Sequence, residues 1–166
     1  MNSIDPAHCR ENLQKLVADE IAALTTLESL LAREHELLVA NDVDNLERAG
    51  AARQECVGVL VRIENERRGL CRMLGQDSDT KGLANLMDWC DPGRTLASSW
   101  SECATRAKRC RELNDRNGIL VGARLQRVSN MLGMLNAGGR DSQVYGPQGT
   151  SPSGTATPGR MVAARA

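Results

Sequence analysis

The residues that could carry chemistry in this chain are two histidines, six cysteines and a few carboxylates inside predicted helices. His8 and His35 lie in neither an E-x-x-H nor an H-E-x-x-H spacing. Glu34 is adjacent to His35, so the two side chains point to different faces of a helix. Di-iron sites in helical bundles depend on such spacings. We therefore expect no metal, no cofactor and no catalytic residue, and a protein that is not an enzyme.

The six cysteines form no metal-binding motif. None belongs to a C-x-x-C pair, and no histidine lies at metal-ligand spacing from them. Five of them fall at positions expected in helices, where a free cysteine behaves as a small hydrophobic residue. An oxidising compartment would endanger six free thiols, so we predict reduced, core-filling thiols and a cytoplasmic protein. The cysteines are Cys9, Cys56, Cys71, Cys90, Cys103 and Cys110.

Carboxylates and glycines give little more support to catalysis. Glu20 and Glu34 could form a buried carboxylate pair, but we expect both in solvated or edge positions. No loop can cradle a phosphate, because Gly118, Gly122 and Gly133 fall inside a predicted helix. Gly118 and Gly122 form a small-xxx-small pair, which permits close approach of another helix or lets the helix bend; the sequence does not separate these two roles.

Composition excludes several other classes of protein. The 166 residues include 21 basic and 21 acidic side chains, so no net charge attracts nucleic acid or anionic membrane. Aromatic residues make up 2%, and phenylalanine is absent, which removes the stacking platforms of single-strand binders. No apolar run reaches signal-peptide length or the ~20 residues that cross a bilayer. We expect a soluble, intracellular, single-domain protein that binds no nucleic acid and does not insert into membranes.

Apolar residues at intervals of three and four predict an all-α fold. Asp5-Pro6 is a helix-start signature, and the leucines that follow continue to Leu38, which gives a first helix of about 34 residues. The break at residues 41–44, in which either Asp42 or Asp44 caps the next helix, implies an antiparallel hairpin. No strand-like alternation appears in the sequence.

The second predicted helix keeps a strict seven-residue repeat. We expect Arg53 and Arg67 to lay their stems along this coiled-coil-like seam and to hold their charges in solvent. Gly75 is the predicted C-terminal cap. Residues 76–82 then form a polar loop, and residues 83–90 form one or two helical turns, which end at Asp91-Pro92-Gly93. The two rows are Ala49, Cys56, Ile63 and Leu70, and Leu46, Arg53, Leu60, Arg67 and Leu74.

The third long helix is predicted to begin near Thr95 and to run for about 42 residues. That makes it longer than either partner by about ten residues, so its last two or three turns would overhang the hairpin. We expect it to end at Gly138-Gly139. Residues 6–136 would then form an elongated antiparallel hairpin with a third long helix, a three-helix coiled-coil-like bundle. Residues 137–166 form a Gly/Pro/Ser/Thr-rich tail that we expect to be disordered.

Two asparagines lie on the seam face of this third helix. Asn114 and Asn117 are three residues apart, which places both on one face. A buried asparagine costs stability unless it is hydrogen-bonded, and its best-attested structural use is to fix helix register. The alternative is that the pair hydrogen-bonds an incoming partner helix.

An apolar, methionine-rich group follows on the same helix. It forms the tip of the three-helix core, or else a surface for partner helices, because flexible thioethers adapt to several apolar partners. The expected overhang favours the second interpretation, since overhanging apolar turns would otherwise be exposed. The group is Val128, Met131, Leu132, Met134 and Leu135.

Together, these features resemble the FlgN family of cytoplasmic flagellar export chaperones. The likeness covers about residues 8–150, and its most specific part is an Asn-x-x-Asn pair followed by a Tyr-Gly tail. The matching residues are Glu28, Leu31 and Glu34; Asn41-Asp42 and Leu46; Leu60, Glu64 and Arg67; Asn114 and Asn117; and Val144-Tyr145-Gly146-Pro147-Gln148-Gly149.

The resemblance implies a chaperone that binds the C-terminal helices of hook–filament junction proteins. It would keep them from premature assembly and deliver them to the flagellar type III export gate, with Tyr145 as the gate-docking residue. A structural, self-associating helical bundle without a chaperone role is the alternative, and a weak homo-oligomer is compatible with both. The implied substrate-binding residues are Val121, Leu125, Val128, Met131, Leu132 and Leu135.

Overall fold

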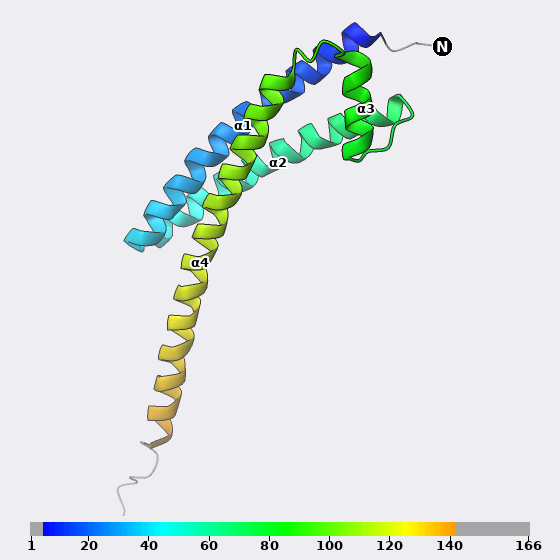
Figure 1. The fold of residues 1–166 in the computed structure, drawn as a ribbon. Helices are drawn as coiled ribbons and strands as arrows, with labels where there is room; N and C mark the ends of the chain where they lie inside the picture. The colour runs from blue at the N-terminus through cyan, green and yellow to red at the C-terminus, as the bar shows by residue number, and fades with distance from the viewer. Residues whose placement is uncertain (1–4, 142–166) are drawn as a thin grey trace, which may run out of the picture. The chain divides into compact units, whose positions relative to one another are not determined.

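The computed structural model describes residues 5–141, which contain four α-helices and no strand (Figure 1). The chain divides into two units after Leu125. The predicted all-α fold is confirmed, with one helix more than the three long ones expected. Of the predicted tail, residues 137–141 belong to the last helix, and the rest lies outside the described residues. The helices are α1 (Pro6–Ala40), α2 (Val43–Met73), α3 (Thr80–Cys90) and α4 (Ala97–Asp141).

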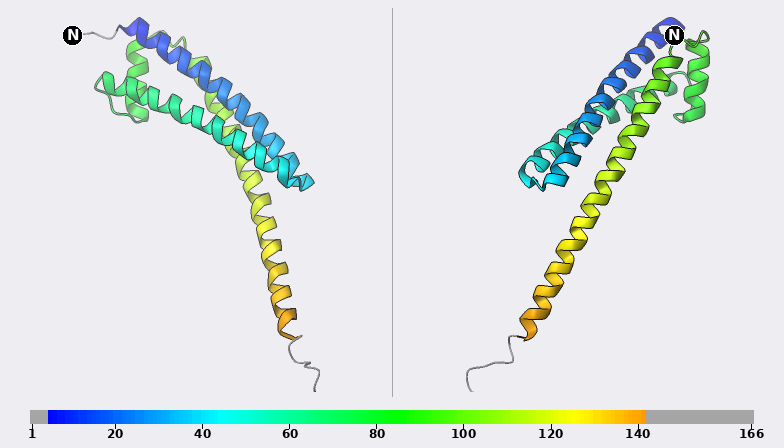
Figure 2. Two further views of the ribbon diagram at one scale, coloured as in Figure 1. Left: turned by 180° about the vertical axis from the view of Figure 1, so that it is seen from behind. Right: turned by 60° about the vertical axis from the view of Figure 1, so that its left-hand side comes forward.

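Helices α1 and α2 form the predicted antiparallel hairpin and lie side by side in every view (Figure 2). The carboxylate of Asp5 caps α1 by accepting a hydrogen bond from the Ala7 amide at 3.2 Å, and Pro6 begins the helix. Asn41 ends α1 in the left-handed conformation. Asp42, rather than Asp44, caps α2, because its carboxylate accepts a hydrogen bond from the Asn45 amide at 3.2 Å.

Helix α2 ends at the predicted glycine. Gly75 has a φ of +67°, in the left-handed region that favours glycine. Its amide donates to the Arg72 carbonyl, and the Gln76 amide donates to the Cys71 carbonyl at 2.9 Å. This is the Schellman arrangement, which satisfies carbonyls that the helix end leaves free.

The expectation that the two seam arginines of α2 hold their charges in solvent was wrong, because both pair with carboxylates of α1, although 37% of the Arg53 side chain stays exposed. Arg53 donates from Nε to Glu34 on α1 at 2.8 Å, and Arg67 forms an ion pair with Glu20. The Arg67 guanidinium also lies over the Trp100 ring of α4, 5.1 Å from its centroid. The guanidinium groups turn toward α1 because carboxylates of α1 face them there.

Glu20 and Glu34 therefore act as arginine partners rather than as a carboxylate pair. Glu34 is buried, so the expected solvated or edge position was wrong for Glu34, whereas Glu20 is partly buried, as at an edge. The residue numbers of both pairs, Glu20 with Arg67 and Glu34 with Arg53, add to 87. Both pairs thus belong to one antiparallel register, and a shift of the hairpin would break both. Breaking a buried pair leaves an uncompensated charge, so the pairs oppose such a shift.

Helix α3 begins earlier than predicted, at Thr80 rather than Leu83, and the preceding loop is correspondingly shorter. Asp79 caps it by accepting a hydrogen bond from the Gly82 amide at 2.7 Å. Gly82 is thus a helical residue. It has no room for a side chain, because a Cβ there would collide with the Asp77 carbonyl.

Asp91 closes the turn between α3 and α4. Its buried carboxylate accepts hydrogen bonds from the Thr95 hydroxyl at 2.6 Å and from the Leu96 amide at 2.9 Å. These hydrogen bonds stabilise the ionised carboxylate and so lower the pKa of Asp91. The bond from the Thr95 hydroxyl has the largest effect. The turn thereby sets where α4 starts.

Helix α4 has 45 residues, against 35 in α1 and 31 in α2, which confirms that it is the longest by ten residues or more. It does not end at Gly138-Gly139 as expected, but continues to Asp141. Glycine lowers helix stability by about 1 kcal/mol relative to alanine but keeps its backbone donor and acceptor, so it does not by itself stop a helix.

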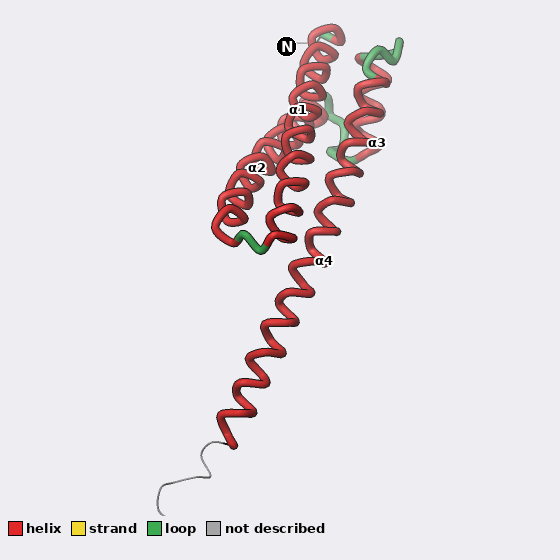
Figure 3. Tube along the Cα trace, turned by 90° about the vertical axis from the view of Figure 1, so that its left-hand side faces the viewer, coloured by secondary structure: helices red, strands yellow, loops and turns green. Residues whose placement is uncertain are grey.

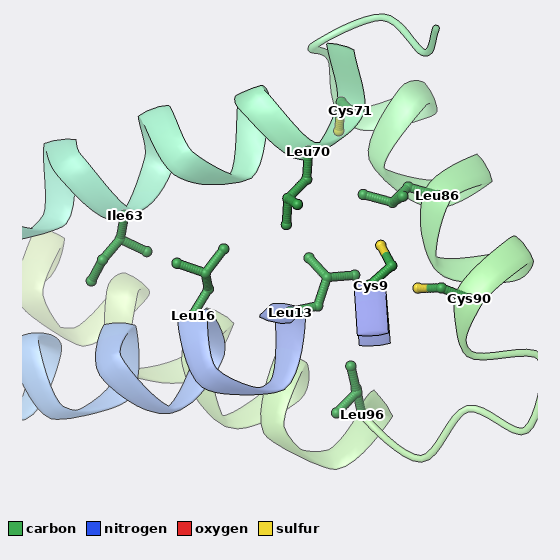
Figure 4. Packing of buried hydrophobic residues seen from close by; sticks show 9 residues of the cluster. All are labelled: Cys9, Leu13, Leu16, Ile63, Leu70, Cys71, Leu86, Cys90 and Leu96. Carbon is green, nitrogen blue, oxygen red and sulfur yellow. The ribbon is translucent and has the colours of Figure 1, made fainter. Parts of the chain in front are cut away.

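The core of the first unit consists of two clusters. One joins α1, α2, α3 and the turn before α4, and it contains three of the cysteines (Figure 4). The other joins α1, α2 and α4 and contains the other three. All six thiols are free and buried, as predicted for core-filling cysteines. Burial raises the pKa of Cys9 and that of Cys103 to about 12.

Candidate functional site

Within the first unit, α4 is attached to α1 by Asn117. Its Nδ2 donates to the Leu31 carbonyl at 2.9 Å, and its Oδ1 lies 3.1 Å from Nδ1 of His35. Because this amide oxygen can only accept, His35 carries its proton on Nδ1 in this contact. Asn117 is buried and both ends of its amide are hydrogen-bonded. These are the contacts of a residue that fixes the register of two helices.

Further contacts follow the same register along α4. The Cys110 thiol donates to the Leu24 carbonyl at 3.4 Å, and Cys110 is 86 residues from Leu24, as Asn117 is from Leu31. A constant offset means that α4 runs parallel to α1 and hence antiparallel to α2. Glu28 adds ion pairs with two arginines of α4, at 3.2 Å and 3.8 Å.

Asn114 does not share the environment of Asn117. Its side chain is exposed, so the expectation that both asparagines lie in the seam was wrong for Asn114. The neighbouring Leu113 packs against the core in its place. One residue along a helix is a rotation of about 100°, which separates the partly buried Leu113 from the exposed Asn114.

A groove lies beside Asn117 and is lined by residues of α1, α2 and α4. Its volume is about 330 Å³, and the ion pair of Glu34 with Arg53 lies at its base. The residues that line it are Glu34, Leu38, Leu46, Gly50, Arg53, Asn114, Asn117, Gly118 and Val121. Roles in packing or binding were predicted for both asparagines, Gly118 and Val121, but not for Gly50, and the inward position of Arg53 was not predicted.

Two larger grooves follow the α1–α2 hairpin, with volumes of about 750 and 650 Å³. They share Asp19 and Glu66, and the first is also lined by Lys15 and Arg72. The charged side chains of both signs in the first groove are typical of the solvated face of an antiparallel hairpin, whereas the second groove also has apolar lining residues such as Leu30, Val59 and Ile63.

The predicted substrate-binding residues are exposed in both units. In the first unit, Val121 is 41% exposed and Leu125 is 66% exposed. In the second unit, the large apolar side chains between Val128 and Leu135 are 53–74% exposed, and they include Met134 as well as the predicted residues. Tyr145, the predicted gate-docking residue, lies outside the described residues.

Other kinds of site find no support in the part of the chain that the structure describes. Between residues 5 and 141, no three histidine, cysteine, aspartate or glutamate side chains come together in a way that could hold a metal ion. None of the helices described has the length and apolar character that crossing a membrane requires.

A family model described as "FlgN protein" matches residues 9–153, which include α2, α3, α4 and nearly all of α1. The chain belongs to the FlgN family. The resemblance found in the sequence is thereby confirmed, and membership makes this chain a flagellar export chaperone. No curated protein and no solved structure matched it.

Proposed function

We propose that this FlgN-family chain binds the C-terminal helices of hook–filament junction proteins in the cytoplasm. It keeps these proteins from premature assembly and delivers them to the flagellar export gate. Binding and release are the whole of this function, without a catalytic step or a cofactor. Membership in a family of export chaperones supports the proposal, and the exposed apolar row of α4 supports the choice of a helical partner.

The observation that carries the proposal is the amphipathic second unit. Val128, Met131, Leu132 and Leu135 share one face of α4 by their spacing, and each is more than half exposed. The opposite face is polar, where Gln126 donates to Asn130 at 3.1 Å. Burying one such apolar side chain against a partner contributes about 1.5–3 kcal/mol, so a helix laid along this face would bind by helix-in-groove packing.

Val121 and Leu125 extend the proposed substrate contacts into the first unit. Both are exposed although they follow the packed residue Asn117 on the same helix. Exposed apolar side chains at this spacing are costly to leave uncovered, and a partner helix would cover them.

The test uses the full-length chain with one charge placed in the apolar row. Leu132→Asp should leave the fold intact, because Leu132 is already 56% exposed, and should abolish co-purification of hook–filament junction proteins. Val61→Asp is the matched control, since Val61 is 54% exposed on α2, and this variant should bind as the wild type does. Undiminished binding by Leu132→Asp would overturn the proposed site.

Gate docking through Tyr145 rests on the family likeness. Tyr145→Ala should reduce export of the junction proteins while folding and partner binding stay unchanged. A fall of several degrees in the melting temperature would instead assign Tyr145 a packing role.

Self-association through the same row is the alternative function. Sedimentation separates the two: a stable oligomer that Leu132→Asp dissociates, together with no binding of junction proteins, would favour the structural protein over the chaperone.

A further inference from the structure

The two large grooves of the α1–α2 hairpin adjoin each other on a face that α4 does not cover. Every residue that lines them belongs to α1 or α2, and Asp19 and Glu66 line both. Helix α4 contacts α1 through other residues, namely Leu24, Glu28 and Leu31. Figure 3 shows the part of α4 in the first unit on one side of the hairpin. Among residues 5–125, this outer face of the hairpin therefore has no partner helix.

The outer face combines buried apolar side chains with exposed charged ones. Leu16, Ile63 and Leu70 are buried, and Val59 is partly buried against the core. All the charged residues that line the two grooves are exposed, and none forms an ion pair in the part of the chain that the structure describes. An apolar centre with a charged periphery is typical of protein–protein interfaces. The charged residues are Lys15, Asp19, Glu55, Arg62, Glu66 and Arg72.

The charges of α2 alternate in sign along this face. From the end of the helix toward its start they are Arg72, Glu66, Arg62 and Glu55. The residue numbers of the outer two add to 127, and those of the inner two add to 128. Residues that face each other across two antiparallel helices have a nearly constant sum, as the arginine–glutamate pairs between α1 and α2 do. A second copy of α2, related by a two-fold axis next to Ile63, therefore brings an arginine opposite a glutamate at all four positions.

Helix α1 repeats the signs of its neighbour on this face. Lys15 lines the first groove together with Arg72, and Asp19 lines both grooves together with Glu66. In the two-fold arrangement, Glu55 of the second copy thus faces two basic side chains. Its Arg62 faces two acidic ones in the same way.

The charges are not used up within the chain. Arg62 and Glu66 are four residues apart on α2, a spacing at which ion pairs often form on a helix. They form no ion pair with each other or with another residue between 5 and 141. Both side chains are therefore available to a partner.

We propose that the outer face of the hairpin binds a second copy of this chain across a two-fold axis, with the two α2 helices antiparallel. The apolar centres of the two faces then cover each other, and the alternating charges fix the register. A parallel contact would place each charge opposite its own copy, which has the same sign, and like charges across an interface are costly. The interface uses no residue of the apolar row of α4, so it goes beyond the proposed function and does not depend on it.

The experiment measures self-association of the full-length chain by sedimentation equilibrium, from about 1 µM to about 1 mM. Arg62→Glu and Glu66→Arg each place like charges opposite one another and should weaken the dimer by about tenfold or more. Arg111→Glu is the matched control and should stay within about twofold of the wild type. Arg111 is also an exposed arginine without an ion pair among the described residues, and an acidic residue, Asp115, again follows four residues later. Circular dichroism checks that each variant is folded.

A mixture of the two variants separates an interface from an effect on folding. An equal mixture of Arg62→Glu and Glu66→Arg should associate more tightly than either variant alone, because the introduced glutamate of one chain faces the introduced arginine of the other. Each chain still has like charges at positions 62 and 66 of its own helix. Recovery in the mixture therefore cannot come from better folding of either chain.

Three results would overturn this inference. The wild type may stay monomeric over the whole concentration range. Alternatively, Leu132→Asp may dissociate the dimer while Arg62→Glu leaves it intact, which would place self-association on the apolar row of α4. The mixture may also associate no more tightly than the separate variants, which would refute the antiparallel register. None of these results bears on the binding of junction proteins, which is measured separately.

Discussion

The buried amide of Asn117, one of several contacts between α4 and α1, yields a sharp stability prediction. Asn117→Ala removes the hydrogen bond to the Leu31 carbonyl and the contact with His35. Each hydrogen bond contributes about 1 kcal/mol net, and leaving the half-buried His35 donor unsatisfied adds about 1 kcal/mol. The higher helix propensity of alanine returns about 0.6 kcal/mol. The free energy of unfolding should therefore fall by about 2 kcal/mol.

Asn114→Ala is the matched control for this prediction. The change of residue type is the same and the helix is the same, but Asn114 is exposed and has no hydrogen-bond partner among residues 5–141. Only the propensity difference remains, so this variant should be more stable than the wild type by about 0.6 kcal/mol. The two alanine variants are thus expected to change stability in opposite directions.

The assay is urea unfolding of the full-length variants, followed by circular dichroism, with the midpoint and slope fitted together. A loss of about 2 kcal/mol corresponds to a fall in melting temperature of about 4–8 °C for a chain of this size. If Asn117→Ala and Asn114→Ala changed the free energy of unfolding by the same amount, Asn117 would not fix the register of α4 on α1.

Three further predictions concern the core and the start of α3. All six cysteines are buried, so the native thiols should resist alkylation at pH 8 and react fully in denaturant, as a thiol titration would show. The pKa of Cys9 and that of Cys103 rise from 9.0 to about 12 on folding, so above pH 9 the unfolded state loses protons that the folded state keeps. Stability should therefore fall progressively between about pH 9 and pH 12 in denaturant titrations, and no loss over that range would contradict the burial of these thiols. Gly82→Ala should lower the melting temperature, because its Cβ collides with the Asp77 carbonyl, whereas Gly58→Ala should raise it; equal effects would mean that Gly82 is not confined.

Several helix ends could be predicted from the sequence, because their signals are local. Asp5-Pro6, the break at residues 41–44 and Gly75 lie next to the backbone groups that they satisfy. The start of α3 was missed although Asp79 is an equally local cap. An 11-residue helix shows too few turns for its apolar period to be distinguished from that of a loop.

Pairings between helices could not be predicted from the sequence. Arg67 and Glu20 are 47 residues apart, and only the register of the hairpin brings them together. In the sequence of α2 alone, Arg67 is a charged residue within an apolar row. Such a residue usually keeps its charged group in solvent. The same limit applies to Asn114 and Asn117, because their difference in burial depends on the path of α4 over α1.

The candidate site could be predicted in part. The exposure of the row from Val128 to Leu135 could be predicted, because the third long helix was expected to be longer than the two helices of the hairpin. The length of each helix can be estimated from its periodicity alone. The groove with Gly50 and Arg53 needs the relative positions of three helices, so no pattern within one helix shows it. The one signal of this groove in the sequence was the presence of glycines inside helices, away from any turn.

The central claim is that the exposed apolar row of α4 binds the exported partner. Its most direct test is the affinity of the full-length chain for a purified hook–filament junction protein, measured by calorimetry for the wild type, Leu132→Asp and Val61→Asp. We expect tight binding by the wild type and by Val61→Asp, and no measurable binding by a folded Leu132→Asp. Equal affinities of all three proteins would contradict it.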